Sequence, residues 1–171
     1  MFTLNGIRRQ ADLQERGIRP WVGTTEINRG TIISGFNNKP QISARLTLHK
    51  SGPSVALKGF MLPFLIASKH DILPKAIKSS WEMMETVLKS NAEWNTGFVL
   101  HPGQSHHQNA SMGTDIPVAE VNNGICYILV CVVYRDQFDR SHKTQDCFRV
   151  IPDLQTIDVR FEVVPAYQMA D

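Results

Sequence analysis

The segment Ile125–Pro152 places the strongest constraint on the fold of this chain. Its first part, Ile125–Tyr134, is apolar at nearly every position, whereas the part after His142 mixes apolar and polar residues. A strand that is apolar on both faces has to be buried on both faces. The polar residues between the two parts are typical of a turn. We therefore expect the central β-hairpin of an antiparallel sheet.

Length and composition describe an ordinary soluble globular domain. The chain has 171 residues, of which 42% are hydrophobic and 20% are charged, and its formal net charge is +2. This length suits one domain with its own core, and so small a charge gives no reason to expect nucleic-acid binding. The longest apolar run, Val55–Ala67, is too short to span a bilayer and is interrupted at Lys58, Gly59 and Pro63. The first residues lack the apolar core and cleavage site of a secretory signal.

The three cysteines do not form a disulfide framework. Cys126 and Cys131 are five residues apart on one expected strand, so they point to opposite faces and cannot pair with each other. A bond from either one to Cys147 across the hairpin stays open as an alternative. Buried free thiols that pack as small apolar groups are the preferred interpretation, which fits a reducing compartment.

Periodicity elsewhere indicates short strands and one inserted helix. Gln41–Lys50 alternates well between apolar and polar residues, as a half-buried strand does, while Asp71–Ser90 shows helical spacing. We expect the helix at about 74–89. Further strands are expected at 21–28, 31–36, 55–67, 98–100 and 154–164, with a polar strand or loop from 105 to 112 and a helical turn within 115–123.

These elements predict a mainly β fold, an antiparallel immunoglobulin-like β-sandwich with an N-terminal helix and one inserted helix. The expected organisation is a charged helix or linker at 1–20 and a β-sandwich domain at 21–171. The N-terminal helix, about Ile7–Ile18, is polar nearly all round and carries Arg8, Arg9 and Arg16. Its positive charge suits either a position near anionic lipid headgroups or a solvated helix face.

The histidines do not predict a metal site. Neighbouring residues on an extended segment point apart, and no carboxylate or cysteine lies nearby at ligand spacing. Structural or solvent-exposed roles are expected for His101, His106, His107 and His142. The chain also lacks a phosphate-binding glycine loop and a nucleophile elbow. We expect no cofactor and no metal.

The polar residues of the central hairpin are the best candidates for a site. We expect Arg135 and Asp136 to stabilise the turn by charge-assisted hydrogen bonds, with Phe138 folding back on the core. The alternative is a ligand or partner contact made by Arg135, Asp136 and His142, since loops often carry function. Cys147 with His142 could also form a nucleophile and its base, provided that the two converge and the thiolate is exposed. A buried Cys147 is the preferred interpretation.

Three groups of residues resemble, in the same order, a large family of small bacterial membrane-anchored proteins, in which transmembrane helices lead through a charged helix into a β-sandwich domain. The first is Gln10–Val22, similar to the juxtamembrane helix and first strand. The second is Leu46–Ala56, similar to a strand–turn–strand, although Lys50-Ser51 replaces the asparagine-threonine of that turn. The third joins Pro102–Ser105 to Tyr134–Phe148, with its Tyr-Arg-Asp hairpin and Cys147. The resemblance implies a fold and brings no activity or catalytic residue.

The resulting functional expectation is a non-enzymatic interaction or sensory domain, the soluble part of a membrane-tethered bacterial protein. It would present loops or a strand edge to a protein partner or to a second copy, without binding nucleic acid. We expect it at the cytoplasmic side of a membrane or in the cytoplasm. A small-ligand-binding domain or enzyme that uses Arg135, Asp136, His142 and Cys147 is the alternative. A structural module that oligomerises through the N-terminal helix is a third.

Overall fold

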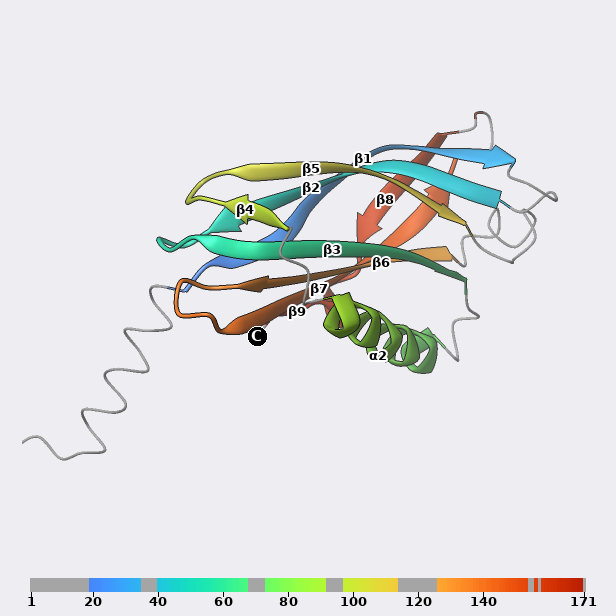
Figure 1. The fold of residues 1–171 in the computed structure, drawn as a ribbon. Coiled ribbons are helices and arrows are strands. Elements are labelled where there is room, and N and C mark those ends of the chain that lie inside the picture. The colour runs from blue at the N-terminus through green and yellow to red at the C-terminus, as the bar shows by residue number, and fades with distance from the viewer. Residues whose placement is uncertain are drawn as a thin grey trace, which may run out of the picture.

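A computed structural model describes residues 19–34, 40–67, 73–91, 97–113, 126–153, 156 and 158–170. The strands in this part of the chain form one antiparallel sheet with the order β4-β3-β6-β7-β8-β1-β2-β5, and β9 pairs with β7. The sheet curls into a half-barrel, and α2 covers the outside of one half (Figure 1). The elements are β1 (Trp21–Ser34), β2 (Pro40–Ser51), β3 (Ala56–Ala67), α2 (Leu73–Asn91), β4 (Phe98–Leu100), β5 (Ser105–Gly113), β6 (Cys126–Arg135), β7 (Ser141–Pro152), β8 (Asp158–Val163), η2 (Pro165–Tyr167) and β9 (Met169–Ala170).

The mainly β, antiparallel class expected from the sequence is therefore confirmed, while the immunoglobulin-like sandwich is not. The strands belong to one continuous curled sheet, and its two halves face each other because the sheet bends. Strong right-handed twist makes such curling a common solution for sheets with many strands. The expected N-terminal helix and the helical turn within 115–123 lie outside the described residues.

The hairpin β6–β7 lies at the centre of the sheet, as expected. All residues of β6 from Cys126 to Val132 are buried, and successive side chains enter two different cores. Ile128 and Val130 face the first core, between the two halves of the curled sheet. Leu129 and Cys131 face the second core, between the sheet and α2. Two-sided burial explains why this strand lacks the alternation of a half-exposed one.

The inserted helix is confirmed and extends one or two residues beyond the expected limits. Its buried residues recur at the spacing of one helical face, and Pro74 lies in the first turn, where proline costs no hydrogen bond. Glu85 links the helix to β7, because its Oε1 lies 2.7 Å from Lys143 Nζ and accepts a 3.0 Å hydrogen bond from Gln145 Nε2. The buried face consists of Leu73, Ile77, Trp81 and Met84.

Two strands deviate from simple ladders. The separate strands expected at 21–28 and 31–36 are, as far as Ser34, one strand, β1. Its pairing with β2 shifts register between Thr24 and Glu26 and again between Asn28 and Thr31. In β3 the expected irregularity is present, because its register with β6 shifts between Leu57 and Phe60. There the ring of Phe98 from β4 lies directly against Gly59, at a place where a Cβ would collide with it.

A buried carboxylate bridges a gap in the sheet. The strand β8 pairs with β1 only at Gly30 and Thr31, so within the described residues the first half of β1 has no strand on that side. Asp146 of β7 reaches across the gap, and its Oδ2 accepts the Thr24 N–H at 2.8 Å. Its Oδ1 accepts Gln168 Nε2 at 3.1 Å. Burial raises the pKa of Asp146, although the hydrogen bonds from Thr24 and Gln168 oppose this.

One end of the half-barrel is closed by two turns. The turn after β2 leads across to β3, and the turn His101–Gln104 leads from β4, at one edge of the sheet, to β5, at the other. The end of β2 is hydrogen-bonded to the second turn, since Lys50 N donates to the Gln104 carbonyl at 3.1 Å and Gly103 N donates to the Lys50 carbonyl at 3.2 Å. None of the described helices is long and apolar enough to cross a membrane.

Candidate functional site

The turn of the central hairpin is organised by Asp136. Its Oδ1 accepts the N–H groups of Phe138 at 2.8 Å and of Arg140 at 3.0 Å. The Asp136 N–H in turn donates to the Arg140 carbonyl at 3.0 Å. An aspartate that binds the backbone two residues ahead is a common way to fix a tight turn. Asp139 then adopts a φ of 61°, a conformation that aspartate tolerates better than most residues.

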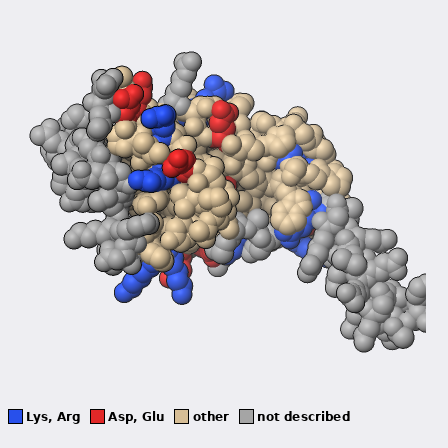
Figure 2. Space-filling model, turned by 180° about the vertical axis from the view of Figure 1, so that it is seen from behind, with Lys and Arg blue, Asp and Glu red and all other residues tan. Residues whose placement is uncertain are grey.

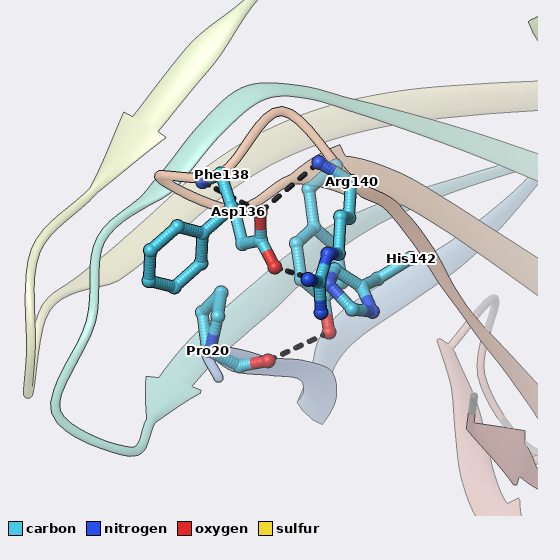
Figure 3. A network of polar contacts seen from close by, with 6 residues as sticks. Pro20, Asp136, Phe138, Arg140 and His142 are labelled. Carbon is cyan, nitrogen blue, oxygen red and sulfur yellow. Dashed lines mark hydrogen bonds and ion pairs between the residues drawn. The ribbon is translucent and has the colours of Figure 1, made fainter. Parts of the chain in front are cut away.

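The second carboxylate oxygen of Asp136 connects the turn to the strands. His142 Nε2 donates to Asp136 Oδ2 at 3.0 Å, and the His142 ring stacks on Tyr134 with the centroids 5.5 Å apart. Tyr134 is the cross-strand partner of His142, and its hydroxyl donates to the Pro20 carbonyl at 3.0 Å. The network therefore ties the hairpin to the chain that enters β1 (Figure 3).

Asp136 is held as a carboxylate. Only 3% of the residue is exposed. Burial by itself raises the pKa of Asp136, but hydrogen bonds from the His142 side chain and from the Arg140 and Phe138 N–H groups outweigh it, so the pKa lies below its ordinary value. These hydrogen bonds support a turn-stabilising role for Asp136.

Replacing Asp136 with alanine should lower the free energy of unfolding by about 1–3 kcal/mol, because two backbone N–H groups and the His142 ring lose their acceptor. A lowered pKa means that the carboxylate stabilises the fold above its unfolded value of about 3.9, and this stabilisation is lost as pH falls through the lower folded value. Urea denaturation of the unaltered protein and of Asp136→Ala at neutral and acidic pH measures this stabilisation. The difference between them should shrink at acidic pH; a constant difference would contradict the role.

Two details of the turn differ from expectation. Arg135 does not pair with Asp136; its guanidinium lies 2.7 Å from Asp139 Oδ1 instead, because Asp136 is turned inward to His142. Phe138 does not fold back on the core, since 52% of it is exposed at the turn. The Arg140 guanidinium lies 5.8 Å from the centroid of the Phe138 ring.

The expected site residues are thus only partly brought together. Arg135, Asp136 and His142 gather at the hairpin turn, whereas Cys147 belongs to the second core beneath α2, where it is fully buried. Burial, with Asp146 next to it, raises the pKa of the Cys147 thiol to about 12. His142 and Cys147 are five residues apart on β7 and therefore lie on opposite faces of the sheet. This geometry does not suit a nucleophile with its base. Cys126, Cys131 and Cys147 are all buried, and none of them forms a disulfide bond.

Two of the other expected histidines, His106 and His107, have local side-chain partners, while His101 is exposed. His107 Nδ1 lies 3.1 Å from Thr47 Oγ1, and the His106 ring stacks on Phe98 with the centroids 4.8 Å apart. Burial is the main cause that lowers the pKa of His106, and the nearby His107 lowers it further. The residues that the structure describes contain no group of three or more side chains suited to a metal ion.

A second candidate site is the outer edge of β5, which the sequence did not single out. The strand pairs with β2 over nine consecutive positions without a register shift. Cross-strand hydrogen bonds hold the pair together on its outer face, joining Ser43 to Ser111 at 3.1 Å and His49 to Ser105 at 3.2 Å. Among the described residues no strand pairs with the other side of β5. The signal in the sequence was a nine-residue polar segment with no charged residue and no proline.

The outer face of β1, β2 and β5 also carries a shallow open hollow of about 290 Å³. Its floor and walls are small or polar residues around the exposed Arg45, with Ser43, Asn109 and Ser111 on the two strands. A hollow this open buries little of a ligand, so it does not resemble an enclosed small-molecule site.

No protein-family model matches the sequence, and comparisons with curated proteins and with solved structures also find no match.

Proposed function

We propose that the chain is a non-enzymatic interaction domain that associates with a second copy of itself through the outer edge of β5. The observation that carries the proposal is the contrast between the two edges of the sheet. An exposed edge strand offers a row of unpaired backbone donors and acceptors, and natural proteins block such edges unless they are used.

The edge formed by β3 and β4 carries such blocking features. β4 has only three residues, and β3 contains both the irregularity at Gly59 and a proline at position 63, which cannot donate a hydrogen bond. These features discourage a further strand on that side.

The edge formed by β5 carries none of them. Its nine residues include no lysine, no other charged residue and no proline, and its pairing with β2 is regular throughout. Side-chain hydrogen bonds of Ser105, His107 and Ser111 also fix the strand to β2. Within the described residues, such an edge offers a preformed row of backbone groups to another strand.

A second copy of β5 is the occupant that this sequence suits best. Two copies related by a two-fold axis at Asn109 would pair antiparallel, with His107 opposite Ser111 of the second copy and Gln108 opposite Ala110. Because β5 contains no charged side chain, this pairing brings no like charges together. Two-fold dimers are also the commonest oligomers of soluble proteins.

The test is sedimentation equilibrium of the full chain over roughly a hundredfold range of concentration. We expect a reversible dimer in the unaltered protein. The Asn109→Lys variant should weaken dimerisation by at least about tenfold, since two like charges then face each other across the axis. Gln137→Lys, an exposed change of the same kind in the hairpin turn, is the matched control and should dimerise normally.

A cysteine at the axis distinguishes this interface from any other. Asn109→Cys should form a disulfide-linked dimer under mild oxidation, whereas Gln137→Cys should not, and the three native thiols are buried. A protein that stays monomeric throughout, or a dimer that Asn109→Lys leaves intact, would overturn the proposal.

A further inference from the structure

The end of the molecule at the β6–β7 turn displays two exposed aromatic rings. Phe138 in the turn is 52% exposed, and Trp21, where β1 begins, is 39% exposed. Pro20, the residue that precedes Trp21, accepts a hydrogen bond from Tyr134 of the same hairpin (Figure 3). The Tyr134–Pro20 hydrogen bond joins the start of β1 to the hairpin, so both rings lie at the same end of the molecule.

Cations accompany both rings. The Arg19 guanidinium lies 3.6 Å from the centroid of the Trp21 ring, and the Arg140 guanidinium lies 5.8 Å from that of Phe138. Arg135 and the exposed Lys58 lie at the same end, both acting on Asp139. We call this set the hairpin-tip surface: Arg19, Trp21, Lys58, Arg135, Phe138 and Arg140. Basic and apolar residues meet at this end on the face shown in Figure 2.

The charge of this surface is positive. Its four cations face two carboxylates, Asp136 and Asp139, which gives a local balance of four minus two, or +2, with His142 neutral. Asp136 is buried and satisfied by His142 and two backbone N–H groups, so it offers little negative charge to a partner. Asp139 is paired with Arg135.

We propose that the hairpin-tip surface binds the headgroup region of an anionic lipid bilayer. Tryptophan and phenylalanine on a turn can enter the interface, where aromatic rings are favoured, while neighbouring arginines reach phosphate and carboxylate groups. Each cation close to an anionic membrane contributes about 1 kcal/mol, or about fivefold in affinity. The Asp136 network holds the turn in one conformation, so little ordering has to occur on binding.

Several features favour a membrane over a single-stranded nucleic acid. Proteins that bind single-stranded nucleic acids combine a basic groove with aromatic faces on which bases stack. Here the Trp21 ring already has the Arg19 guanidinium against one face, and Phe138 is an exposed turn residue. A flat bilayer accommodates such a protruding turn. The proposal does not depend on the pairing of β5.

The test is co-sedimentation of the full chain with vesicles of phosphatidylcholine alone or with about 30% phosphatidylserine. We expect binding to the anionic vesicles only, and weaker binding as salt rises. The double variant Phe138→Ala, Arg140→Gln should reduce the partition coefficient at least about tenfold, from one apolar side chain and one cation together.

The matched control is Met83→Ala, Arg160→Gln, which removes an exposed apolar side chain from α2 and an arginine from β8. It should bind as the unaltered chain does, and circular dichroism should show that both double variants are folded. Both retain Arg8, Arg9 and Arg16, so equal binding by the two variants would place the lipid contact elsewhere and overturn the proposal. Binding to a single-stranded oligonucleotide but not to vesicles, with the same sensitivity to Phe138, would replace the membrane by a nucleic acid.

Discussion

Replacing Trp81 with alanine should lower the free energy of unfolding by about 3–5 kcal/mol, the usual cost of removing a large aromatic side chain from a core. Trp81 is 6% exposed and belongs to the second core, together with Leu129 and both Cys131 and Cys147. This core depends on α2, because the helix supplies one of its two sides. Urea denaturation followed by far-ultraviolet circular dichroism measures the loss.

Thiol labelling of the same variant reports where the structure loosens. In the unaltered protein Cys147 should react slowly, since it is buried and its pKa is raised to about 12. In Trp81→Ala we expect faster labelling of Cys131 and Cys147, while Cys126, which belongs to the first core, stays protected. Met83→Ala is the control on the same helix; with 43% of Met83 exposed, it should change stability by less than about 0.5 kcal/mol. Equal labelling of all three thiols would mean that the two cores do not open separately.

Removing the Asp146 side chain should cost about 1–3 kcal/mol, because the buried Thr24 N–H then has no acceptor. Asp146→Ala tests this loss directly by urea denaturation. Asp146→Asn is the informative comparison, since an amide oxygen can still accept the Thr24 N–H. The exposed Gln168 can turn its own amide to accept from the new one. We therefore expect Asp146→Asn to be much less destabilising than Asp146→Ala.

The two variants also separate the charge of Asp146 from its hydrogen bonds. Burial raises the pKa of this carboxyl, so the folded state holds the proton more tightly than the unfolded state does. The resulting stabilisation is fully present below the unfolded value of about 3.9 and is lost as pH rises through the higher folded value. Stability measured from about pH 4 to about pH 7 should therefore fall more in the unaltered protein than in Asp146→Asn. Parallel pH profiles would contradict this account.

Local pattern was enough to predict the elements whose burial is regular. The two-sided burial of β6, the alternation of β2 and the single apolar stripe of α2 each follow from the chemistry of consecutive residues. The opposite orientation of Cys126 and Cys131 follows from the same period of two, and the two cysteines do enter different cores.

Relations between distant residues could not be predicted in this way. The bond between Asp146 and Thr24 joins positions 122 apart, and nothing near either residue indicates the other. The arrangement of strands into one curled sheet likewise depends on pairings such as β3 with β6. Within the candidate site, the partners of Arg135 and Asp136 depended on the backbone of the turn, where Asp139 has positive φ. The position of β5 at an edge depended on the strand order of the whole sheet.

The turns at the closed end of the half-barrel limit how the sheet can move. Pairing joins β3 to β4 and β2 to β5, and the two turns join β2 to β3 and β4 to β5, which makes a ring of four strands. At this end the opposite edges cannot separate unless a strand pair breaks or the backbone is cut. Any widening of the half-barrel must therefore pivot about this ring, and the start of β5 stays in place during that motion. A protease cut within His101–Gln104 would release that restraint without removing a single core side chain.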